Sequence, residues 1–198
     1  MILQYGQEGF SENWLEYIKN DPVHPTISIQ KRITGNRTVF VYTDGNTPQF
    51  MICARIGNKL PHNMMEVLND DGYISKFDLT YAVFYSVFRL PNATLRGAGT
   101  LAIKSLIEHC ASKGVDNFYT LSPIPSLRDY FKIKPDESTI RKYLEAFDGN
   151  VSKFHLSNGA KIHSINFEAD YSEIRINESW GVMVNYDYNN ILRTSVNL

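Results

Sequence analysis

Cysteine is scarce in this sequence and long apolar runs are missing, and both absences exclude whole classes of protein. The only cysteines among the 198 residues are Cys53 and Cys110, which form no C-x-x-C pair. A disulfide framework is therefore not indicated, and we expect two buried free thiols in a reducing compartment. No stretch of about 18 apolar residues occurs, so the sequence predicts no membrane span. The N-terminus lacks the basic start and apolar run of a signal peptide.

A strong excess of one charge is also missing. Lysine and arginine total 20, aspartate and glutamate total 21, and the formal net charge is −1. We therefore expect neither a nucleic acid nor an anionic membrane as a partner. The histidines have no spacing typical of a metal site, so no metal is predicted. With 43% apolar residues and no internal repeat, residues 1–198 are predicted to form one globular domain in the cytoplasm.

What the sequence does contain is an alternation of strand-like and helix-like segments. Strands are expected at 26–33, 37–44, 49–57, 79–90, 115–121 and 180–188, with another after the Asn-Gly turn of "HLSNGAKIH". Helices are expected at 11–20, 61–70, 126–131 and 137–147, and around the i, i+3, i+4, i+7 pattern from Ile103 to Cys110. This order indicates a mixed α/β (α+β) fold, with a mixed sheet flanked by helices.

The run "LRGAGT" joins the most apolar strand to the central helix. Gly97 and Gly99 would let backbone amides approach an anion, and the helix N-terminus adds partial positive charge. The flanking Arg96, Ala98 and Thr100 complete a predicted phosphate cradle. A simple glycine turn into a helix explains the same residues and stays open. The run is not a dinucleotide-binding fingerprint, because it lacks the third glycine of that motif.

Ser122 stands at the end of a predicted strand in "TLSPIP". Pro123 and Pro125 have no N–H to offer its hydroxyl. Ser126, with Asp129 three residues later, is the better candidate to cap the following helix. Sites gather at strand ends in α/β sheets. Ser122 is therefore a candidate functional residue, held at a corner that two prolines stiffen.

His155 lies in "KFHLSNGAKIH", just before a tight turn. A lone histidine beside a phenylalanine is more often structural than catalytic. A structural role is likewise the more common one for histidines such as His24 and His163. A Ser122–His155 pair would also suit nucleophilic hydrolysis. However, the sequence has no G-x-S-x-G elbow, and no aspartate stands out as a third member.

Taken together, these stretches resemble the catalytic domain of malonyl-CoA decarboxylase. Five stretches match motifs of that family in the same order. "YAVFYSVFRL" (81–90) resembles its "AVFYSIS" strand, "GTLAIKSLIEH" (99–109) its "GNFLIKRVV" helix, and "TLSPIP" (120–125) its S-P-I-P run. "FHLSNGAKIHSINFEADYS" (154–172) resembles its "FHLxNGAxLxxINWxAD" segment and "WGVMVNYDY" (180–188) its "GLMVNYRY" strand, and "VHP" (23–25) fits the start of that domain.

The resemblance implies an N-acetyltransferase-like fold and conversion of malonyl-CoA to acetyl-CoA and carbon dioxide. The family's active-site serine, histidine and tyrosine fall on Ser122, His155 and Tyr188. We expect Ser122 to stabilise an enolate, His155 to donate as imidazolium and protonate the enolate, and Tyr188 to orient His155. The run from Arg96 to Gly99 resembles a contracted form of the fold's acetyl-CoA-binding motif. No cofactor is implied, because CoA or a phosphopantetheine arm carries the substrate.

Two departures from the family keep alternatives open. The helical domain that precedes the family's catalytic domain and serves oligomerisation has no counterpart in the sequence, and the "TLRGAGT" loop is about two residues shorter than usual. The substrate is therefore malonyl-CoA or a malonyl-carrier protein, in fatty acid metabolism or polyketide biosynthesis. Arg89, Arg96 and Lys104 are candidate contacts for an acyl carrier protein. The alternatives are an acyl-CoA-dependent acyltransferase and a non-catalytic acyl-CoA-binding module.

Overall fold

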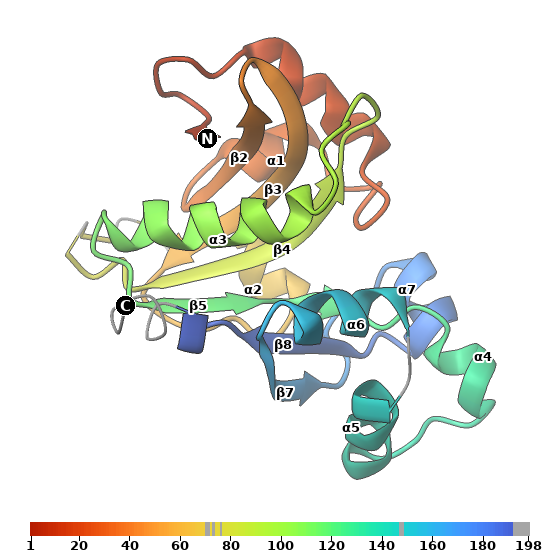
Figure 1. Ribbon diagram of the computed structural model, residues 1–198. Helices are drawn as coiled ribbons and strands as arrows, with labels where there is room; N and C mark the ends of the chain where they lie inside the picture. The colour runs from red at the N-terminus through yellow and green to blue at the C-terminus, as the bar shows by residue number, and fades with distance from the viewer. Residues whose placement is uncertain (70–71, 73, 76, 147–148, 192–198) are drawn as a thin grey trace. The chain divides into compact units, whose positions relative to one another are not determined.

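The chain folds into two compact units, which Figure 1 shows in the computed structural model. The structure describes residues 1–69, 72, 74–75, 77–146 and 149–191. The first unit comprises Met1–Leu60 and the segment from Leu68 to Phe118, and the second comprises Pro61–Val67 and the chain from Tyr119 onward. Among the described residues, no helix is both long and apolar enough to cross a membrane.

The first unit contains an antiparallel sheet in the order β1-β2-β3-β4. Its elements are β1 (Ile2–Gln4), the 3-10 helix η1 (Glu12–Asn20), α1 (Ile29–Ile33), β2 (Arg37–Asp44), β3 (Thr47–Gly57), β4 (Tyr81–Arg89) and α3 (Ala98–Ala111). Strand β5 (Asn117–Thr120) begins in this unit and ends in the second. Val41 lies opposite Met51, and Ile52 lies opposite Val87. The predicted strands β2, β3 and β4 are confirmed, whereas β1 was not predicted.

Helix α3 packs against the sheet of the first unit through its apolar stripe (Figure 1). Ile103, Leu106, Ile107 and Cys110 are buried at the helical spacing that the sequence shows. Gly114 then takes a φ of 93°, a left-handed conformation that few side chains tolerate, and the helix cannot continue through it. The sequence therefore predicts this helix and its end correctly.

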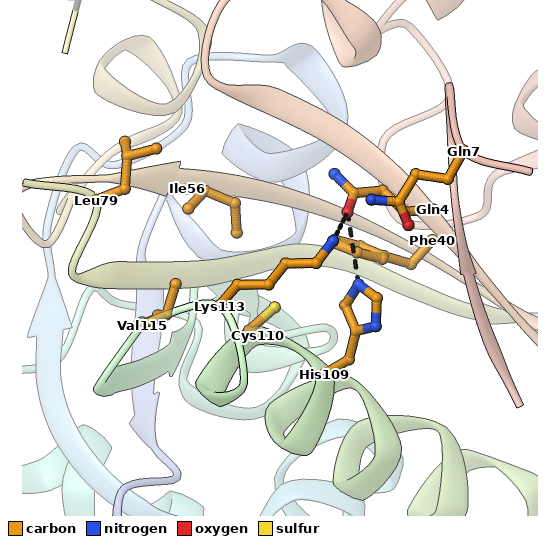
Figure 2. A pocket seen from close by; sticks show the side chains of 9 residues that line it. All are labelled: Gln4, Gln7, Phe40, Ile56, Leu79, His109, Cys110, Lys113 and Val115. Carbon is orange, nitrogen blue, oxygen red and sulfur yellow. Dashed lines mark hydrogen bonds between the residues drawn. The ribbon is translucent and has the colours of Figure 1, made fainter. Parts of the chain in front are cut away.

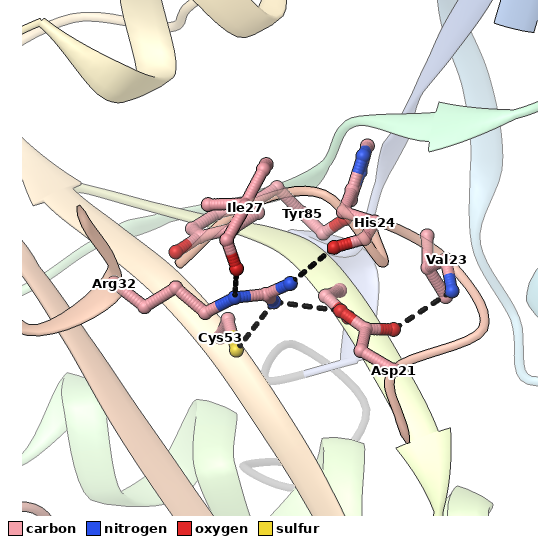
Figure 3. A network of polar contacts seen from close by, with 8 residues as sticks. Asp21, Val23, His24, Ile27, Arg32, Cys53 and Tyr85 are labelled. Carbon is pink, nitrogen blue, oxygen red and sulfur yellow. Dashed lines mark hydrogen bonds and ion pairs between the residues drawn. The ribbon is translucent and has the colours of Figure 1, made fainter. Parts of the chain in front are cut away.

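A buried polar network joins the N-terminal segment to the sheet of the first unit (Figure 3). Arg32 Nη1 lies 2.6 Å from Asp21 Oδ2 and 3.2 Å from Cys53 Sγ, and neither the Arg32 nor the Asp21 side chain is exposed. Ser86 Oγ donates to Asp21 at 2.7 Å, and Arg32 also donates to the carbonyl oxygen of His24. Such a buried pair is tolerated because each charge has both a counter-charge and hydrogen bonds.

The same network explains two residues that the sequence left open. His24 Nε2 lies 3.0 Å from the carbonyl oxygen of Tyr85, so His24 has a structural role in this unit. Burial raises the pKa of the Cys53 thiol to about 11. Cys53 and Cys110 are both buried and free, as predicted.

The second unit is built around a central strand, β8 (Met183–Asp187). Its other elements are α2 (Met64–Leu68), β6 (Ser122–Pro123), α4 (Leu127–Phe131), α5 (Glu137–Ala146), α6 (Asn150–Ser157), β7 (Lys161–Asn166) and α7 (Glu173–Ser179). Strand β8 pairs antiparallel with β6 and β7, and its Val184 lies opposite both Ser122 and Ile165. Tyr119 of β5 lies opposite Asp187. Pairing on both edges holds β8 in the middle of this unit.

Two local predictions are wrong. The segment 26–33 was expected to be a strand, but α1 forms there because the Ser28 side chain accepts a hydrogen bond from the Lys31 amide at 3.4 Å and caps the helix. Ser126 was expected to cap α4, but it has a φ of 66° and makes no side-chain cap bond. Its left-handed backbone directs the chain into the helix without the hydroxyl.

Candidate active site

Ser122 lies at the start of the two-residue strand β6, where the backbone pairs with Val184 of β8. Its side chain is buried, and Ser122 Oγ lies 2.9 Å from Thr120 Oγ1. Asn185 donates from Nδ2 to the Thr120 carbonyl oxygen at 2.9 Å, which fixes the chain just before the corner. The proline-rich corner therefore holds Ser122 inside the unit with its hydroxyl already in a hydrogen-bonded chain.

His155 reaches the same place from α6, which packs on β7 (Figure 1). Its ring is buried, with Nε2 3.0 Å from Ser122 Oγ and Nδ1 2.8 Å from the hydroxyl oxygen of Tyr188. The structure thus brings together all three residues that the resemblance named. Helix α6 itself was missed, because the sequence there predicted only the turn after it.

Two tyrosines of the β8 segment surround the imidazole. Tyr186 and Tyr188 are two residues apart, so they point to the same side of the strand. The Tyr186 ring stacks on the His155 ring with a centroid distance of 4.5 Å and an interplanar angle of 24°, and the Tyr188 ring meets it edge-on at 5.9 Å and 76°. Sequence reasoning predicted the strand that carries Tyr186 but missed the contact of Tyr186 with His155. The N-Y-D-Y alternation was the available signal.

Burial sets the protonation states of this cluster. It lowers the pKa of His155 from 6.5 to about 3, because the buried imidazolium would lose its hydration. It also raises the pKa of Tyr188 above its usual 10, and Tyr186 adds to that rise. His155 is therefore neutral and both phenols are protonated near pH 7. Burial thus opposes the imidazolium form in which His155 is expected to donate, and that role stays a prediction.

Two arrangements of hydrogens fit this chain of polar atoms. In one, the Tyr188 hydroxyl donates to His155 Nδ1, His155 Nε2–H donates to Ser122 Oγ, and the Ser122 hydroxyl donates to Thr120 Oγ1. In the other, each bond is reversed and the Ser122 hydroxyl donates to Nε2. Each arrangement leaves one terminal hydroxyl hydrogen, that of Thr120 or that of Tyr188, without an acceptor among the described residues. The geometry therefore fits either tautomer of His155.

The predicted phosphate cradle lies in the first unit, at the N-terminus of α3. Gly97 has a φ of 74° and is the residue that precedes the helix, and Gly99 is buried in its first turn. A side chain at Gly97 would meet no atom within 4 Å, so its backbone conformation is the reason for glycine there. Arg96 and Thr100 are exposed on either side and Ala98 is buried. Phosphate binding by these residues stays a prediction.

The first unit also has a cavity of about 300 Å³, which is separate from the cradle residues (Figure 2). Lys113 Nζ and His109 Nε2 lie 2.7 Å and 3.5 Å from Gln4 Oε1 at its edge. Burial raises the pKa of the Cys110 thiol in its wall to about 12, which makes this thiol a poor nucleophile. Within the described residues, no cluster of three or more histidine, cysteine or acidic side chains could hold a metal.

Part of the chain is similar to a known protein family. Residues 138–193, which include His155 and Tyr188, match the family model of the malonyl-CoA decarboxylase C-terminal domain. The resemblance to malonyl-CoA decarboxylase is confirmed. No curated protein matches the chain significantly.

Solved structures of malonyl-CoA decarboxylases also match. The enzyme from Rhodopseudomonas palustris is 23% identical with a TM-score of 0.71, over 95% of this chain and 56% of that one. The enzyme from Agrobacterium vitis is 21% identical with a TM-score of 0.74, over 95% of this chain and 60% of that one. The chain therefore spans less than two thirds of the length of these malonyl-CoA decarboxylases.

The loading GNATL domain of CurA from Lyngbya majuscula has a similar fold and size. It is 14% identical with a TM-score of 0.60, over 94% of this chain and 98% of that one. At this identity the match shows fold alone. The predicted N-acetyltransferase-like α+β fold is confirmed.

Proposed function

We propose that this protein is a carboxy-lyase that removes carbon dioxide from a malonyl thioester, in the manner of malonyl-CoA decarboxylase. The observation that carries the proposal is the buried hydrogen-bonded chain Tyr188–His155–Ser122. The match of residues 138–193 to the malonyl-CoA decarboxylase domain supports it.

The reaction needs a donor where negative charge develops. When the bond between C2 and the carboxylate carbon breaks, its electron pair moves into the thioester and an enolate forms. Donors that are already aimed at such an oxygen usually contribute the largest part of catalysis. Ser122 is rigidly placed by β6, and its hydrogen can turn from Thr120 Oγ1 to the thioester oxygen. We assign it this role.

His155 supplies the proton that C2 needs. It is neutral without substrate, but the negative charge of a bound malonyl group favours the imidazolium and raises its pKa. His155 then takes up a proton from solvent and passes it to C2 as the carbon dioxide leaves. The net reaction consumes one proton and releases the acetyl thioester. Tyr188 holds Nδ1 and fixes the direction of the ring throughout.

The same geometry disfavours the competing activities. A nucleophilic serine needs a base that takes its hydrogen, and burial that lowers the pKa of His155 to about 3 makes it a weak base. An acyltransferase also needs a base, and His155 suits that role poorly for the same reason. Because Ser122, His155 and Tyr188 form a connected buried chain, catalysis is favoured over simple acyl-CoA binding.

The thiol that carries the malonyl group is the finer part of the proposal. The loop from Arg96 to Thr100 at the start of α3 supports CoA, since a helix N-terminus with close glycines suits its phosphates. Arg89, Arg96 and Lys104 are exposed on the first unit and keep a carrier protein as the alternative thiol donor.

The test is to incubate the purified protein with malonyl-CoA and, separately, with a malonyl-loaded carrier protein, and to follow acetyl product by mass spectrometry. We expect Ser122→Ala to lower turnover by about 10²–10³-fold while CoA affinity is kept. Ser157→Ala is the matched control, because that serine is exposed at the end of α6 and bonds only the Phe154 carbonyl oxygen. No acetyl product from either substrate would refute the proposal.

A further inference from the structure

Tyr186 has a buried hydroxyl for which the described part of the chain offers no hydrogen-bond partner. Its side chain is 0% exposed, whereas Tyr188, two residues later, bonds His155 Nδ1 at 2.8 Å. The two tyrosines thus differ: one hydroxyl belongs to the site's hydrogen-bond chain, and the other has no acceptor among the described residues.

Packing explains the Tyr186 ring but not its oxygen. The ring lies nearly flat on the imidazole of His155, at 4.5 Å and 24°, and phenylalanine would present the same ring face. Burying a hydroxyl without an acceptor costs stability, and native proteins rarely leave such groups unsatisfied. We therefore expect the acceptor of this hydroxyl to be a group outside the described residues.

The position of the hydroxyl indicates what that acceptor is. The imidazole beneath the Tyr186 ring has Ser122 at one nitrogen and Tyr188 at the other, so Tyr186 covers the face of the group that handles the proton. Burial also raises the pKa of Tyr186 above its usual 10, which keeps the phenol a donor near pH 7. A neutral donor in a buried site suits an anionic oxygen, because it stabilises the charge without removing it.

We propose that the Tyr186 hydroxyl donates a hydrogen bond to an anionic oxygen of the bound malonyl group. This inference rests on the proposed function and adds Tyr186 to the residues that touch the substrate. The acceptor is either the carboxylate or the thioester oxygen that becomes the enolate. The carboxylate is charged in the bound substrate, whereas the thioester oxygen becomes charged only as the enolate forms. Separate measurement of kcat and KM therefore distinguishes the two acceptors.

The test is Tyr186→Phe, which removes only the unpaired hydroxyl. We expect kcat/KM for malonyl-CoA to fall tenfold to a hundredfold, while the melting temperature without ligand stays equal or rises. A fall in kcat at constant KM assigns the enolate oxygen, and a rise in KM at constant kcat assigns the carboxylate. Tyr171→Phe is the matched control, because Tyr171 is exposed and its hydroxyl contacts Glu168; its kcat/KM should not change.

Two results would overturn the inference. One is a kcat/KM for Tyr186→Phe within twofold of the parent protein, and the other is a large fall in melting temperature without ligand, which would make the hydroxyl structural. If the parent protein decarboxylates neither malonyl-CoA nor the malonyl-loaded carrier protein, the proposed function fails separately. Calorimetric binding of malonyl-CoA then decides: tenfold weaker binding by Tyr186→Phe supports the contact, and equal binding refutes it.

Discussion

His155 should make the stability of this protein fall in mild acid, and the size of the effect follows from its burial. In the unfolded chain the imidazole takes a proton near its ordinary pKa of 6.5, whereas in the folded protein burial lowers the pKa to about 3. Between those values the unfolded state binds more protons, so lowering the pH favours unfolding. The contribution of neutral His155 is complete above pH 6.5 and is lost progressively as the pH falls toward 3.

The magnitude is large enough to measure. Each pH unit below 6.5 is worth about 1.4 kcal/mol for one such group. At pH 5 the folded protein should therefore have lost about 2 kcal/mol through His155, a substantial part of the roughly 5–15 kcal/mol that holds a typical domain folded. Other titrating groups add their own pH dependence, so the measured quantity is a difference from a variant that lacks the imidazole.

The assay is urea unfolding at pH 7, 6 and 5 for the parent protein and His155→Gln. Glutamine keeps an amide for hydrogen bonding but does not titrate, so we expect the variant to lose about 2 kcal/mol less than the parent between pH 7 and pH 5. His109→Gln is the control: partial burial and Lys113 lower the pKa of His109 as well, but its ring is less buried, so its effect should be smaller in the same direction. Equal pH dependence in the parent and His155→Gln would refute the reasoning.

Three further predictions concern other parts of the molecule. Asp21→Ala should lower the free energy of unfolding by about 3–5 kcal/mol, because it leaves the buried Arg32 charge without its counter-charge; a loss below about 1 kcal/mol in urea melts would contradict this. Cys53 and Cys110 should react with a thiol reagent at pH 8 only after unfolding, since burial holds both pKa values well above 8; fast modification of the native protein would show otherwise. Tyr188→Phe should lower kcat by at least tenfold while CoA binding is kept, because His155 Nδ1 loses its partner; unchanged kcat in steady-state assays would remove Tyr188 from the mechanism.

Apolar periodicity determined most of the elements without any knowledge of the tertiary structure. The buried stripe of α3 and the largely buried strand β4 each match an apolar pattern that can be read directly from the residues, whereas β8 is buried on both faces and not on alternate residues. The segment 26–33 shows the limit of this reasoning. Its β-branched residues favour a strand, but the Ser28 cap and the buried ion pair of Arg32 favour the helix α1.

Ser122 was singled out from its own surroundings, but His155 and Tyr188 were named as site residues only through the resemblance to malonyl-CoA decarboxylase. Ser122 and His155 are 33 residues apart, as are His155 and Tyr188, and no local pattern relates positions that distant. Thr120, Asn185 and Tyr186 were missed for the same reason, since their contribution is a contact and not a motif.

The sequence by itself thus determined most of the elements and the fold class. Through the family's motifs it also identified the serine, histidine and tyrosine of the candidate site. Only the tertiary structure decided how they work. It buried the imidazole deeply enough to keep it neutral, placed its Nε2 3.0 Å from Ser122 Oγ, and left the Tyr186 hydroxyl without an acceptor among the described residues. Protonation and hydrogen bonding depend on the solvent that folding removes and on neighbours that folding brings near, and neither is written in the local order of residues.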